Sequence, residues 1–446
     1  MALLAYFPYI QAMIIERLRA ARDASAQKSE LKRMLADCDE LIRERGQSVS
    51  VGIATRVIAR FNKLGPEARA EFYSQLASRY NPNLDEIDRA LDAYRRSQTG
   101  EHLVRFVKSS EPPRQELLRR INRAPSGTGI VVRMRQEILA RMKSNPQLCA
   151  ADADFEHLLS SWFNPGFLEL EKLDWNSPAH LLEQVIQHEA VHAIDGWSDL
   201  RRRLEPDRRL FAYFHPALPG EPLIFVEVAL VAEMPKAVGP LLDRSKDPNL
   251  NKKDYKVAAF YSISNCQPGL KGIHLGNFLI KRVAEELKNE FPTIKTFCTL
   301  SPIPSLADFL AKDPSWDERY FTTRQIESFT QDVVRMQNKL QAFAKSGANG
   351  DSEDIKTLTR LSAAYLAQTS SDESRRCDPV ARFHLNNGAV LDRINLMADA
   401  SAKGLRQSFG LMVNYRYELD AVEENHERFV RGEVACSGAV KSQLKS

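Results

Sequence analysis

The stretch AAFYSISNCQPGLKGIHLGNFLIKRVAEEL, from Ala258 to Leu287, decides the fold of the second half of the chain. Its first residues are aromatic and β-branched, which predicts a strand that ends near Ser264. A loop with Gly269, Gly272 and Gly276 follows, and apolar residues at helical spacing then predict a helix from about Gly276. A strand, a glycine loop and a helix in this order can direct backbone N–H groups at phosphate oxygens.

The spacing of these glycines argues against two common nucleotide-binding motifs. It matches neither G-x-G-x-x-G, which binds dinucleotides, nor G-x-x-x-x-G-K-[ST], which binds ATP. The loop therefore points away from NAD and ATP. By themselves the residues leave two interpretations open: a loop that binds another phosphate-containing ligand, and a plain glycine-containing turn.

The segments on either side of this stretch differ in their periodicity. Up to about residue 165, segments such as ELKRMLADCDELIRERG and PEARAEFYSQLASRY have helical spacing, and no strand is expected. Past Trp175, the runs RRLFAYFH, PLIFVEVALV, IKTFCTL, ARFHLNN and GLMVNYRY predict strands, whereas residues 315–370 are expected to be mostly helical. We therefore predict an α+β protein with an all-helical domain over residues 1–165 and a sheet-containing domain over residues 166–446.

Composition and charge narrow the class of protein. The hydrophobic content of 43% and the charged content of 27% are typical of a folded globular chain. A net charge of +4 is too small to indicate nucleic-acid binding by itself. No run approaches the roughly 18 apolar residues of a membrane span. The six cysteines form no C-x-x-C pair, which favours free thiols in a reducing, intracellular compartment.

The segment HEAVH, from His188 to His192, fits the zinc-peptidase motif H-E-x-x-H. Ser177-Pro178 as the start and Gly196 as the end predict a helix that places both histidines on one face. A zinc site also needs a third protein ligand, and none follows at a recognised spacing. Two packed histidines at the edge of an apolar helix face are the favoured interpretation, with zinc as the minor alternative.

Four further segments, before and after the glycine loop in the sequence, also contain specific motifs. They are EFPTIKTFCTLSPIPSLADFL, FHPALPGEPLIFVEVALV, PPRQELLRRINRAPSGTGIVVRMR and ARFHLNNGAVLDRINLMADASAKGLRQSFGLMVNYRYEL. Together with the loop they resemble the malonyl-CoA decarboxylase family, from about residue 45 to about residue 430. The resemblance implies a helical domain followed by a catalytic domain of the GNAT-type N-acetyltransferase fold. It also identifies EAVH as a family segment, in which the first histidine of HEAVH is not a usual feature.

The resemblance implies site residues at the matching motif positions. The catalytic serine of LSPIP is Ser301 and the catalytic histidine of FHLNNGA is His384. Ser262, in SIS, is a lesser candidate for shaping the substrate site. The pyrophosphate of coenzyme A is expected on the loop, mainly at backbone N–H groups, with the following residues lining it: Lys271, Gly272, Ile273, His274, Leu275, Gly276 and Asn277.

Two observations limit the assignment of these site residues. Ser301 by itself would be interpreted as a turn serine, and His384, expected on a strand, as a structural histidine. His274 stands where family members often have an acidic residue, which puts in doubt any role that requires a carboxylate there.

The implied activity is the decarboxylation of malonyl-CoA to acetyl-CoA and CO2. The carboxylate leaves as CO2, the electrons pass into a thioester enolate, and an acid protonates the carbon. A histidine with a reference pKa near 6.5 can be that acid, and neither a metal ion nor a separate cofactor is expected. The alternatives are a GNAT-type acyl-CoA transferase and a non-enzymatic module that binds malonyl-CoA.

Partners and location are expectations of the same kind. The family resemblance implies a homo-oligomer, a dimer or a tetramer, that binds malonyl-CoA and acetyl-CoA, and no nucleic-acid or membrane partner is expected. The final residues QLKS do not match the peroxisomal signal S-K-L, which favours the cytoplasm.

Overall fold

The computed structural model describes residues 7–44, 46–273, 275, 279–312, 314–347, 351–372 and 374–445. The chain forms two compact units. The first comprises Met1–Phe167 together with the short segments Pro216–Pro219 and Gln267–His274, and the second comprises the rest. Judged by its contacts, most of the glycine loop therefore belongs to the first unit. In the sequence, however, the loop connects a strand and a helix of the second unit.

The first unit is helical throughout its described part, as the periodicity predicts. Several helix starts follow from local sequence: Pro66 stands at the first turn after Gly65, and the side chain of Asn83 accepts a hydrogen bond from the Glu86 N–H. The helices are α1 (Phe7–Arg43), α2 (Gln47–Lys63), α3 (Pro66–Arg79), α4 (Leu84–Arg96), α5 (Gly100–Ser110), α6 (Pro113–Asn122), α7 (Gly127–Arg141) and α8 (Cys149–Trp162).

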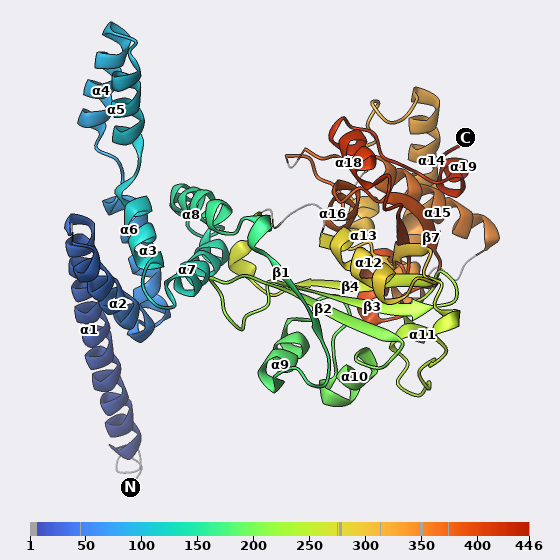
Figure 1. Ribbon diagram of the computed structural model, residues 1–446, viewed down its shortest axis with the longest axis horizontal. Coiled ribbons are helices and arrows are strands. Elements are labelled where there is room, and N and C mark those ends of the chain that lie inside the picture. Colours follow the sequence, from blue (N-terminus) through green and yellow to red (C-terminus); the bar gives the residue numbers. More distant parts are fainter. Residues whose placement is uncertain are drawn as a thin grey trace. The chain divides into compact units, whose positions relative to one another are not determined.

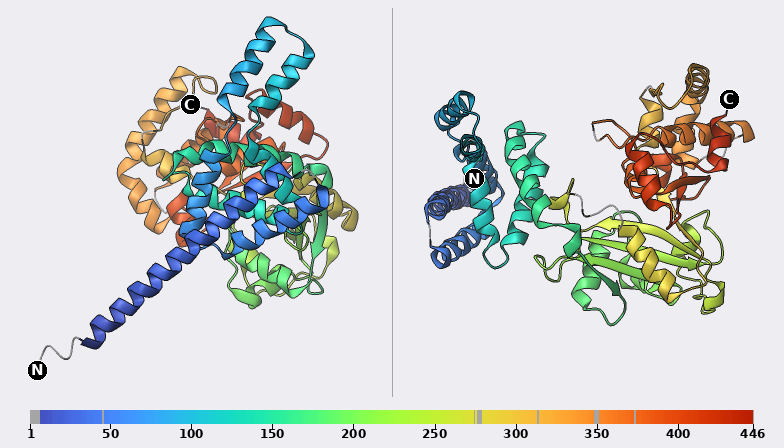
Figure 2. Two further views of the ribbon diagram at one scale, coloured as in Figure 1. Left: turned by 90° about the vertical axis from the view of Figure 1, so that its left-hand side faces the viewer. Right: turned by 45° about the horizontal axis from the view of Figure 1, so that its top comes forward.

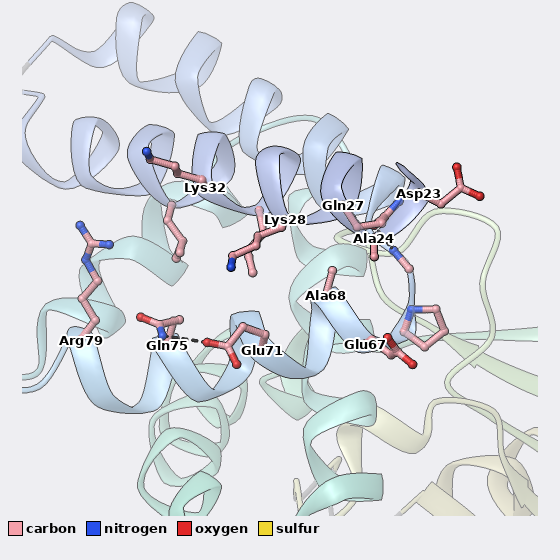
Figure 3. Close-up of a pocket in the computed structure, with 14 residues that line it drawn as sticks. Asp23, Ala24, Gln27, Lys28, Lys32, Glu67, Ala68, Glu71, Gln75 and Arg79 are labelled. Atoms are coloured by element: carbon pink, nitrogen blue, oxygen red, sulfur yellow. Dashed lines mark hydrogen bonds between the residues drawn. The ribbon is translucent and has the colours of Figure 1, made fainter. Parts of the chain in front are cut away.

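Two surface features distinguish this unit. The α4–α5 hairpin projects from the other helices of the unit (Figures 1 and 2). A groove of about 1020 Å³ runs between α1 and α3, where Lys28 points toward Glu71 (Figure 3). None of the residues proposed for the active site lines this groove.

The second unit is built on one eight-stranded sheet in the order β1-β2-β3-β4-β5-β8-β6, with β7 also paired to β8. All the strand pairs are antiparallel except β4 with β5, which are parallel and are joined through the helix α12 (Leu279–Glu290). The strands are β1 (Glu169–Leu173), β2 (Arg208–Phe214), β3 (Ile224–Val231), β4 (Val257–Asn265), β5 (Thr296–Thr299), β6 (Ser301–Pro302), β7 (Val390–Asn395) and β8 (Met412–Tyr417).

Helices cover both faces of the sheet (Figure 1). The helices α9 (Ala179–His188) and α10 (Gly196–Arg203) pack on one face, where Ala212 and Phe225 contribute to the core. The next residue along β2, Tyr213, points to the other face and donates its hydroxyl hydrogen to the Leu279 carbonyl of α12. Since both faces are covered, the central strands are apolar almost throughout.

The two parallel strands separate where the sheet approaches the proposed site. β4 pairs with β5 from Val257 to Phe260, and the Leu300 N–H still donates to the Phe260 carbonyl at 2.9 Å. Beyond this point β4 continues along β3, and Ser301 pairs instead with Val413 of β8. An irregularity in the β3–β4 register at Glu227/Val228 lies beside the same point. A space opens between the diverging strands.

The remaining helices surround the C-terminal part of the sheet. They are α11 (Gly239–Leu242), α13 (Leu306–Ala311), α14 (Thr323–Ser346), α15 (Ser352–Ala367), α16 (Pro379–Asn386), α17 (Ala402–Ser408), α18 (Val422–Val430) and α19 (Gly438–Leu444). The expectation that residues 315–370 are mostly helical is confirmed by α14 and α15. No helix in the described ranges is long and apolar enough to cross a membrane.

The prediction of a strand at ARFHLNN was wrong. These residues lie in α16, because Asp378 caps the helix start and Pro379 occupies its first turn, where a missing N–H costs nothing. The strand β7 follows instead, after Gly388 at φ +77°. β1 was also missed, because only Leu173 of its five residues is buried.

The prediction that HEAVH lies within one helix was also wrong. α9 ends at His188, and Glu189 leaves the helix with ψ 109°. Gly196, expected to end this helix, is instead the first residue of α10. Consequently His188 and His192 do not share a helix face.

Candidate active site

Ser301 stands at the point where β5 has ended and the chain crosses to β8. Its side chain is 5% exposed, and its hydroxyl donates to Thr299 Oγ1 at 2.8 Å. Thr299 Oγ1 in turn accepts the Tyr415 N–H at 3.2 Å. Pro302 restricts the following backbone and Leu300 is fully buried. The serine is therefore held in one orientation by both neighbouring strands.

His384 reaches the same point from the last turn of α16. Its Nε2 lies 2.9 Å from Ser301 Oγ, and its Nδ1 lies 2.9 Å from the Tyr417 hydroxyl of β8. The ring also stacks on Tyr415, with 4.7 Å between centroids. Ser301 and His384, which the sequence motifs single out separately, are in direct contact.

The directions of these hydrogen bonds follow from the number of hydrogens available. Since Ser301 donates to Thr299, its oxygen accepts from His384 Nε2–H. The opposite nitrogen, Nδ1, then accepts from the Tyr417 hydroxyl. Burial lowers the pKa of the His384 imidazole to about 3, because the charged form would be desolvated. The imidazole is therefore neutral near pH 7.

Asp378 connects the two elements that present this pair. One carboxylate oxygen accepts the N–H groups of Val380 and Ala381, at 3.0 and 3.1 Å, and thereby caps α16. The other accepts the Ser305 N–H at 3.2 Å, in the turn after Ser301. Burial raises the pKa of this carboxyl to about 6. The same side chain thus fixes the start of the histidine helix and the loop after the serine.

A cavity of about 280 Å³ opens in front of the pair, between the diverging strands. Its polar side chains include Ser262, Ser301 and His384. Its apolar lining includes Val191, Ile224, Phe260, Pro302, Val380 and Phe383. A largely apolar cavity with a few converging polar groups is typical of a small-molecule site.

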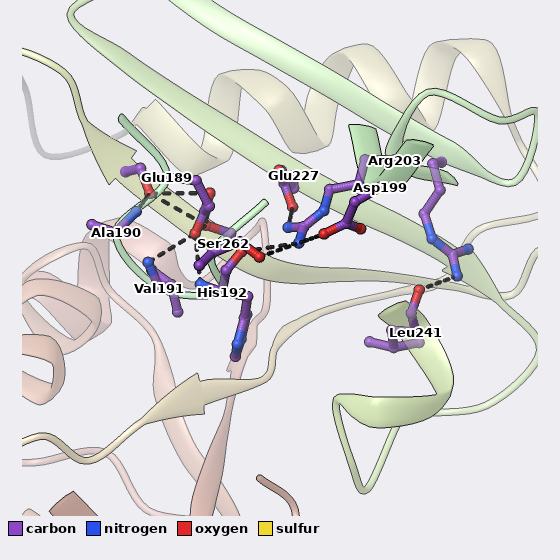
Figure 4. Close-up of polar contacts among 12 residues, drawn as sticks. Glu189, Ala190, Val191, His192, Asp199, Arg203, Glu227, Leu241 and Ser262 are labelled. Atoms are coloured by element: carbon purple, nitrogen blue, oxygen red, sulfur yellow. Dashed lines mark hydrogen bonds and ion pairs between the residues drawn. The ribbon is translucent and has the colours of Figure 1, made fainter. Parts of the chain in front are cut away.

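Ser262 lines this cavity, but its hydroxyl hydrogen is already used. Ser262 Oγ lies 2.8 and 2.7 Å from the two carboxylate oxygens of Glu189, which can only accept (Figure 4). Toward the cavity Ser262 therefore presents lone pairs rather than a donor.

Glu189 also explains why the helix α9 stops. Its carboxylate accepts the N–H groups of Val191 and His192, each at 2.8 Å, in place of carbonyls one turn earlier (Figure 4). Arg203 binds the His192 carbonyl at 2.9 Å, and Lys403 binds the Ala190 carbonyl at 2.6 Å. With its polar groups bound in this way, the segment places Val191 in the cavity wall.

The structure does not provide the geometry that a zinc site at HEAVH would need. Within the described ranges, no group of three or more His, Cys, Asp or Glu side chains could hold a metal ion. Burial lowers the pKa of His192 to about 4, and its Nε2 has no partner among the described residues. Glu189, the general base in that interpretation, is instead bonded to serine and backbone donors.

The glycine loop is described only in part. His274, Gly276 and Asn277 lie outside the described residues. Ile273 and Leu275 are buried, whereas Lys271 and Gly272 are exposed. The Lys271 and Ile273 N–H groups donate to the Pro268 and Leu270 carbonyls, at 3.2 and 3.0 Å. The Gly272 N–H has no partner in the described part of the chain.

Two residues of the site were missed in the sequence. Tyr417 ends the strand GLMVNYRY, and nothing in the alternation distinguishes it from a packed tyrosine. Asp378 had a usable signal, because an acidic residue before proline is a common helix start.

Comparison with protein families decides the classification. The profile of the "Malonyl-CoA decarboxylase C-terminal domain" matches residues 166–446, and that of the "Malonyl-CoA decarboxylase N-terminal domain" matches residues 80–163. The chain belongs to the malonyl-CoA decarboxylase family. The family resemblance stated from the motifs is thereby confirmed, and with it the class of enzyme, a carboxy-lyase.

Relatives in the family cover most of the chain. The mitochondrial malonyl-CoA decarboxylase of Rattus norvegicus is 32% identical over 438 residues, which are 92% of this chain and 88% of the relative. The mitochondrial enzyme of Mus musculus is 36% identical over 333 residues, 70% of this chain and 67% of the relative.

Solved structures of the family have the same fold. Malonyl-CoA decarboxylase from Rhodopseudomonas palustris is 42% identical with a TM-score of 0.83, and the match covers 92% of this chain and 99% of that chain. The structure from Agrobacterium vitis is 41% identical with a TM-score of 0.81, covering 93% and 100%. A helical N-terminal region followed by a sheet domain is thus the family's architecture.

Proposed function

We propose that the chain converts malonyl-CoA to acetyl-CoA and CO2, with Ser301 and His384 as its catalytic residues and without a metal ion. The observation that carries this proposal is the hydrogen-bonded chain from Tyr417 through His384 to Ser301, which ends at the cavity. Membership of the decarboxylase family supports the reaction, and the geometry supports the assignment of roles.

Ser301 stabilises the thioester oxygen, on which negative charge develops during the reaction. When the bond between C2 and the carboxylate carbon breaks, CO2 leaves and the electron pair passes into the thioester as an enolate. In the structure the Ser301 hydroxyl donates to Thr299. With substrate bound, the same hydrogen turns to the thioester oxygen and stabilises its developing charge. The apolar walls exclude water and favour loss of the charged carboxylate.

His384 supplies the proton as a neutral imidazole rather than as an imidazolium. Burial holds its pKa near 3, so Nε2 carries a hydrogen that can pass to the enolate carbon, a much stronger base. The Tyr417 hydroxyl keeps its hydrogen, because burial raises its pKa well above the usual value, and it continues to donate to Nδ1 across 2.9 Å, which stabilises the negative charge that develops on the ring. A proton from water at the cavity then restores the Nε2–H. The sequence analysis expected a histidine acid with the reference pKa near 6.5. In this proposal the pKa is lower, and the acid is the neutral imidazole.

The coenzyme A part of the substrate is assigned to the glycine loop, and the sheet-containing unit is assigned a GNAT-type fold. The order β4, loop, α12, β5 and the separation of β4 from β5 support this fold. Of the loop residues proposed from the motif, Lys271 offers an exposed charge and Gly272 an N–H that has no partner among the described residues. Ser262 accepts a hydrogen bond from the substrate, since its own hydrogen is bound to Glu189.

The first experiment is to mix the purified protein with malonyl-CoA, with and without EDTA, and to follow acetyl-CoA and CO2 together. We expect equal amounts of both products and no effect of the chelator. Tight binding without either product would contradict the proposal and favour a binding module. Transfer of the acyl group to an amine without CO2 would favour an acyl-CoA transferase.

Assembly and location remain proposals drawn from the sequence. We infer a homo-oligomer, a dimer or a tetramer, and a cytoplasmic location; the names of the Rattus and Mus relatives place those proteins in mitochondria. Sedimentation of the purified protein and fractionation of the source cells test the two statements.

A further inference from the structure

Arg135, in the middle of α7, is among the largest fully buried side chains of the chain, with an exposed fraction of 2%. Its Nη1 donates to two carbonyl oxygens of the glycine loop, those of Gly269 at 3.0 Å and Lys271 at 2.7 Å. All three residues belong to the first compact unit. A helix remote in sequence is thus bonded to the backbone of the loop.

The charge of Arg135 is balanced within the same unit. Its Nε donates to Asp152 at 2.9 Å, and its Nη2 lies 3.5 Å from Glu156. Burying a guanidinium is costly unless its donors are satisfied, and here two carbonyls and a carboxylate satisfy several of them. A lysine, with one compact donor group, cannot reach the carboxylate and both carbonyls at once.

Backbone packing holds the loop against the same helix. A Cβ atom on Gly269 would lie 2.0 Å from the Val132 carbonyl oxygen of α7, so the loop approaches the helix more closely than any other residue allows. The arginine and the glycine therefore fix the same stretch of loop by independent contacts.

These contacts determine where one free N–H group points. The Lys271 carbonyl and the Gly272 N–H belong to one peptide unit, and in a trans peptide they point in opposite directions. Because the carbonyl faces Arg135, the N–H must point away from α7. It has no partner in the described part of the chain, and Gly272 adopts φ +82°, a conformation that favours glycine.

We propose that Arg135 is a positioning residue for coenzyme A: it orients the Gly272 N–H and the adjacent Lys271 toward the pyrophosphate of the substrate. The inference rests on the proposed function, which assigns the pyrophosphate to this loop. It adds a residue of the helical unit that touches no substrate and yet sets the affinity for the nucleotide end of the substrate.

The test compares two substrates that differ only in the part the loop would bind. Malonyl-CoA contains the pyrophosphate, whereas the malonyl thioester of N-acetylcysteamine does not. For R135K we expect the KM for malonyl-CoA to rise about tenfold, the size of one lost hydrogen bond to a charged group, with kcat within about twofold. For the truncated thioester we expect kcat/KM to equal that of the unchanged protein.

The matched control is R133K, on the same helix. Arg133 is exposed, bonds the Asn62 side chain and does not contact the loop, so neither substrate should be affected. Should R135K fail to fold, G269A moves the loop away from α7 while keeping the arginine, and the same selective rise in KM is expected. Far-ultraviolet circular dichroism and gel filtration verify the fold of each variant.

Three outcomes would overturn the inference. An equal loss with both substrates would show that Arg135 only supports the fold, and an unchanged KM in both R135K and G269A would show that the loop needs no such support. If the unchanged protein does not decarboxylate malonyl-CoA, the proposed function fails by itself. Calorimetric titration with coenzyme A then tests the inference separately, and equal affinity in R135K and the unchanged protein contradicts it.

Discussion

Each nitrogen of the His384 ring has a different hydroxyl partner, and this makes the side chain hard to replace. Ser301 and Tyr417 bond Nε2 and Nδ1, both at 2.9 Å, and Tyr415 stacks on the ring face. An asparagine at this position could meet only one of the two hydroxyls. It has no proton to give to carbon at a useful rate.

The first residue-scale prediction is therefore the effect of H384N. We expect kcat to fall by about 100-fold or more, the range attributed to general acid catalysis, while coenzyme A binding stays within about twofold. Product formation and calorimetric titration measure the two quantities. H157N, at an exposed histidine of the helical unit, is the control. A near-normal rate in H384N would remove the histidine from the mechanism.

The second residue-scale prediction concerns pH. A histidine with its reference pKa near 6.5 would become charged as the pH falls from 8 to 6. Burial lowers the pKa of His384 to about 3, so its neutral form persists through this range. In kcat at saturating malonyl-CoA we therefore expect no inflection near pH 6.5 that depends on His384; a fall toward pH 6 is expected from the Asp378 carboxyl, whose pKa burial raises to about 6. An inflection near 6.5 that disappears in H384N would contradict the neutral imidazole.

At the scale of elements, α16 determines whether Ser301 and His384 can make contact. Ser301 and His384 are 83 positions apart in the sequence. The helix α16 brings His384 to Ser301 only if it is capped at Asp378. The carboxylate binds two N–H groups of the helix and one N–H of the serine loop. A neutral amide can accept through only one of its two atoms.

The element-scale prediction is that D378N weakens both the fold and the reaction. The amide nitrogen would face either the helix or the Ser305 N–H as donor against donor, at a cost of about 1–3 kcal/mol in the free energy of unfolding. We also expect kcat to fall, because the serine loop is no longer tied to α16. Urea unfolding and the product assay measure the two effects.

The control for D378N is D308N. Asp308 is exposed and pairs with Lys312 four residues on, so we expect a change in unfolding free energy within about 0.5 kcal/mol. Equal stability of D378N and the unchanged protein would show that the carboxylate does not hold the two elements together.

Some helices and strands were predicted correctly from the sequence, and others were not. β2, β3 and β4 were predicted because strands buried on both faces are apolar and β-branched throughout. α9 was predicted to extend through HEAVH because helical periodicity continues there. It ends at His188 because the hydrogen bond from Ser262 to Glu189 and the contacts with Arg203 and Lys403 favour a different backbone. Such contacts are non-local and leave no periodic trace.

At the scale of the molecule, three separate parts of the chain converge on the proposed reaction. Ser301 follows β5, His384 comes from α16, and Tyr417 ends β8. β8 unites them, because it pairs with β5, β6 and β7. The glycine loop is held separately, by α7 within the first compact unit.

The amino-acid sequence by itself determined the helical and sheet-containing halves, the glycine loop and the family, because periodicity and contiguous motifs are local properties of the chain. Through the family resemblance it also predicted Ser301 and His384 as site residues. Only the tertiary structure decided that these two side chains touch, that Tyr417 completes the chain of hydrogen bonds, and that His384 is neutral. These properties depend on distances and burial between residues far apart in sequence, which the packing of the sheet and α16 creates.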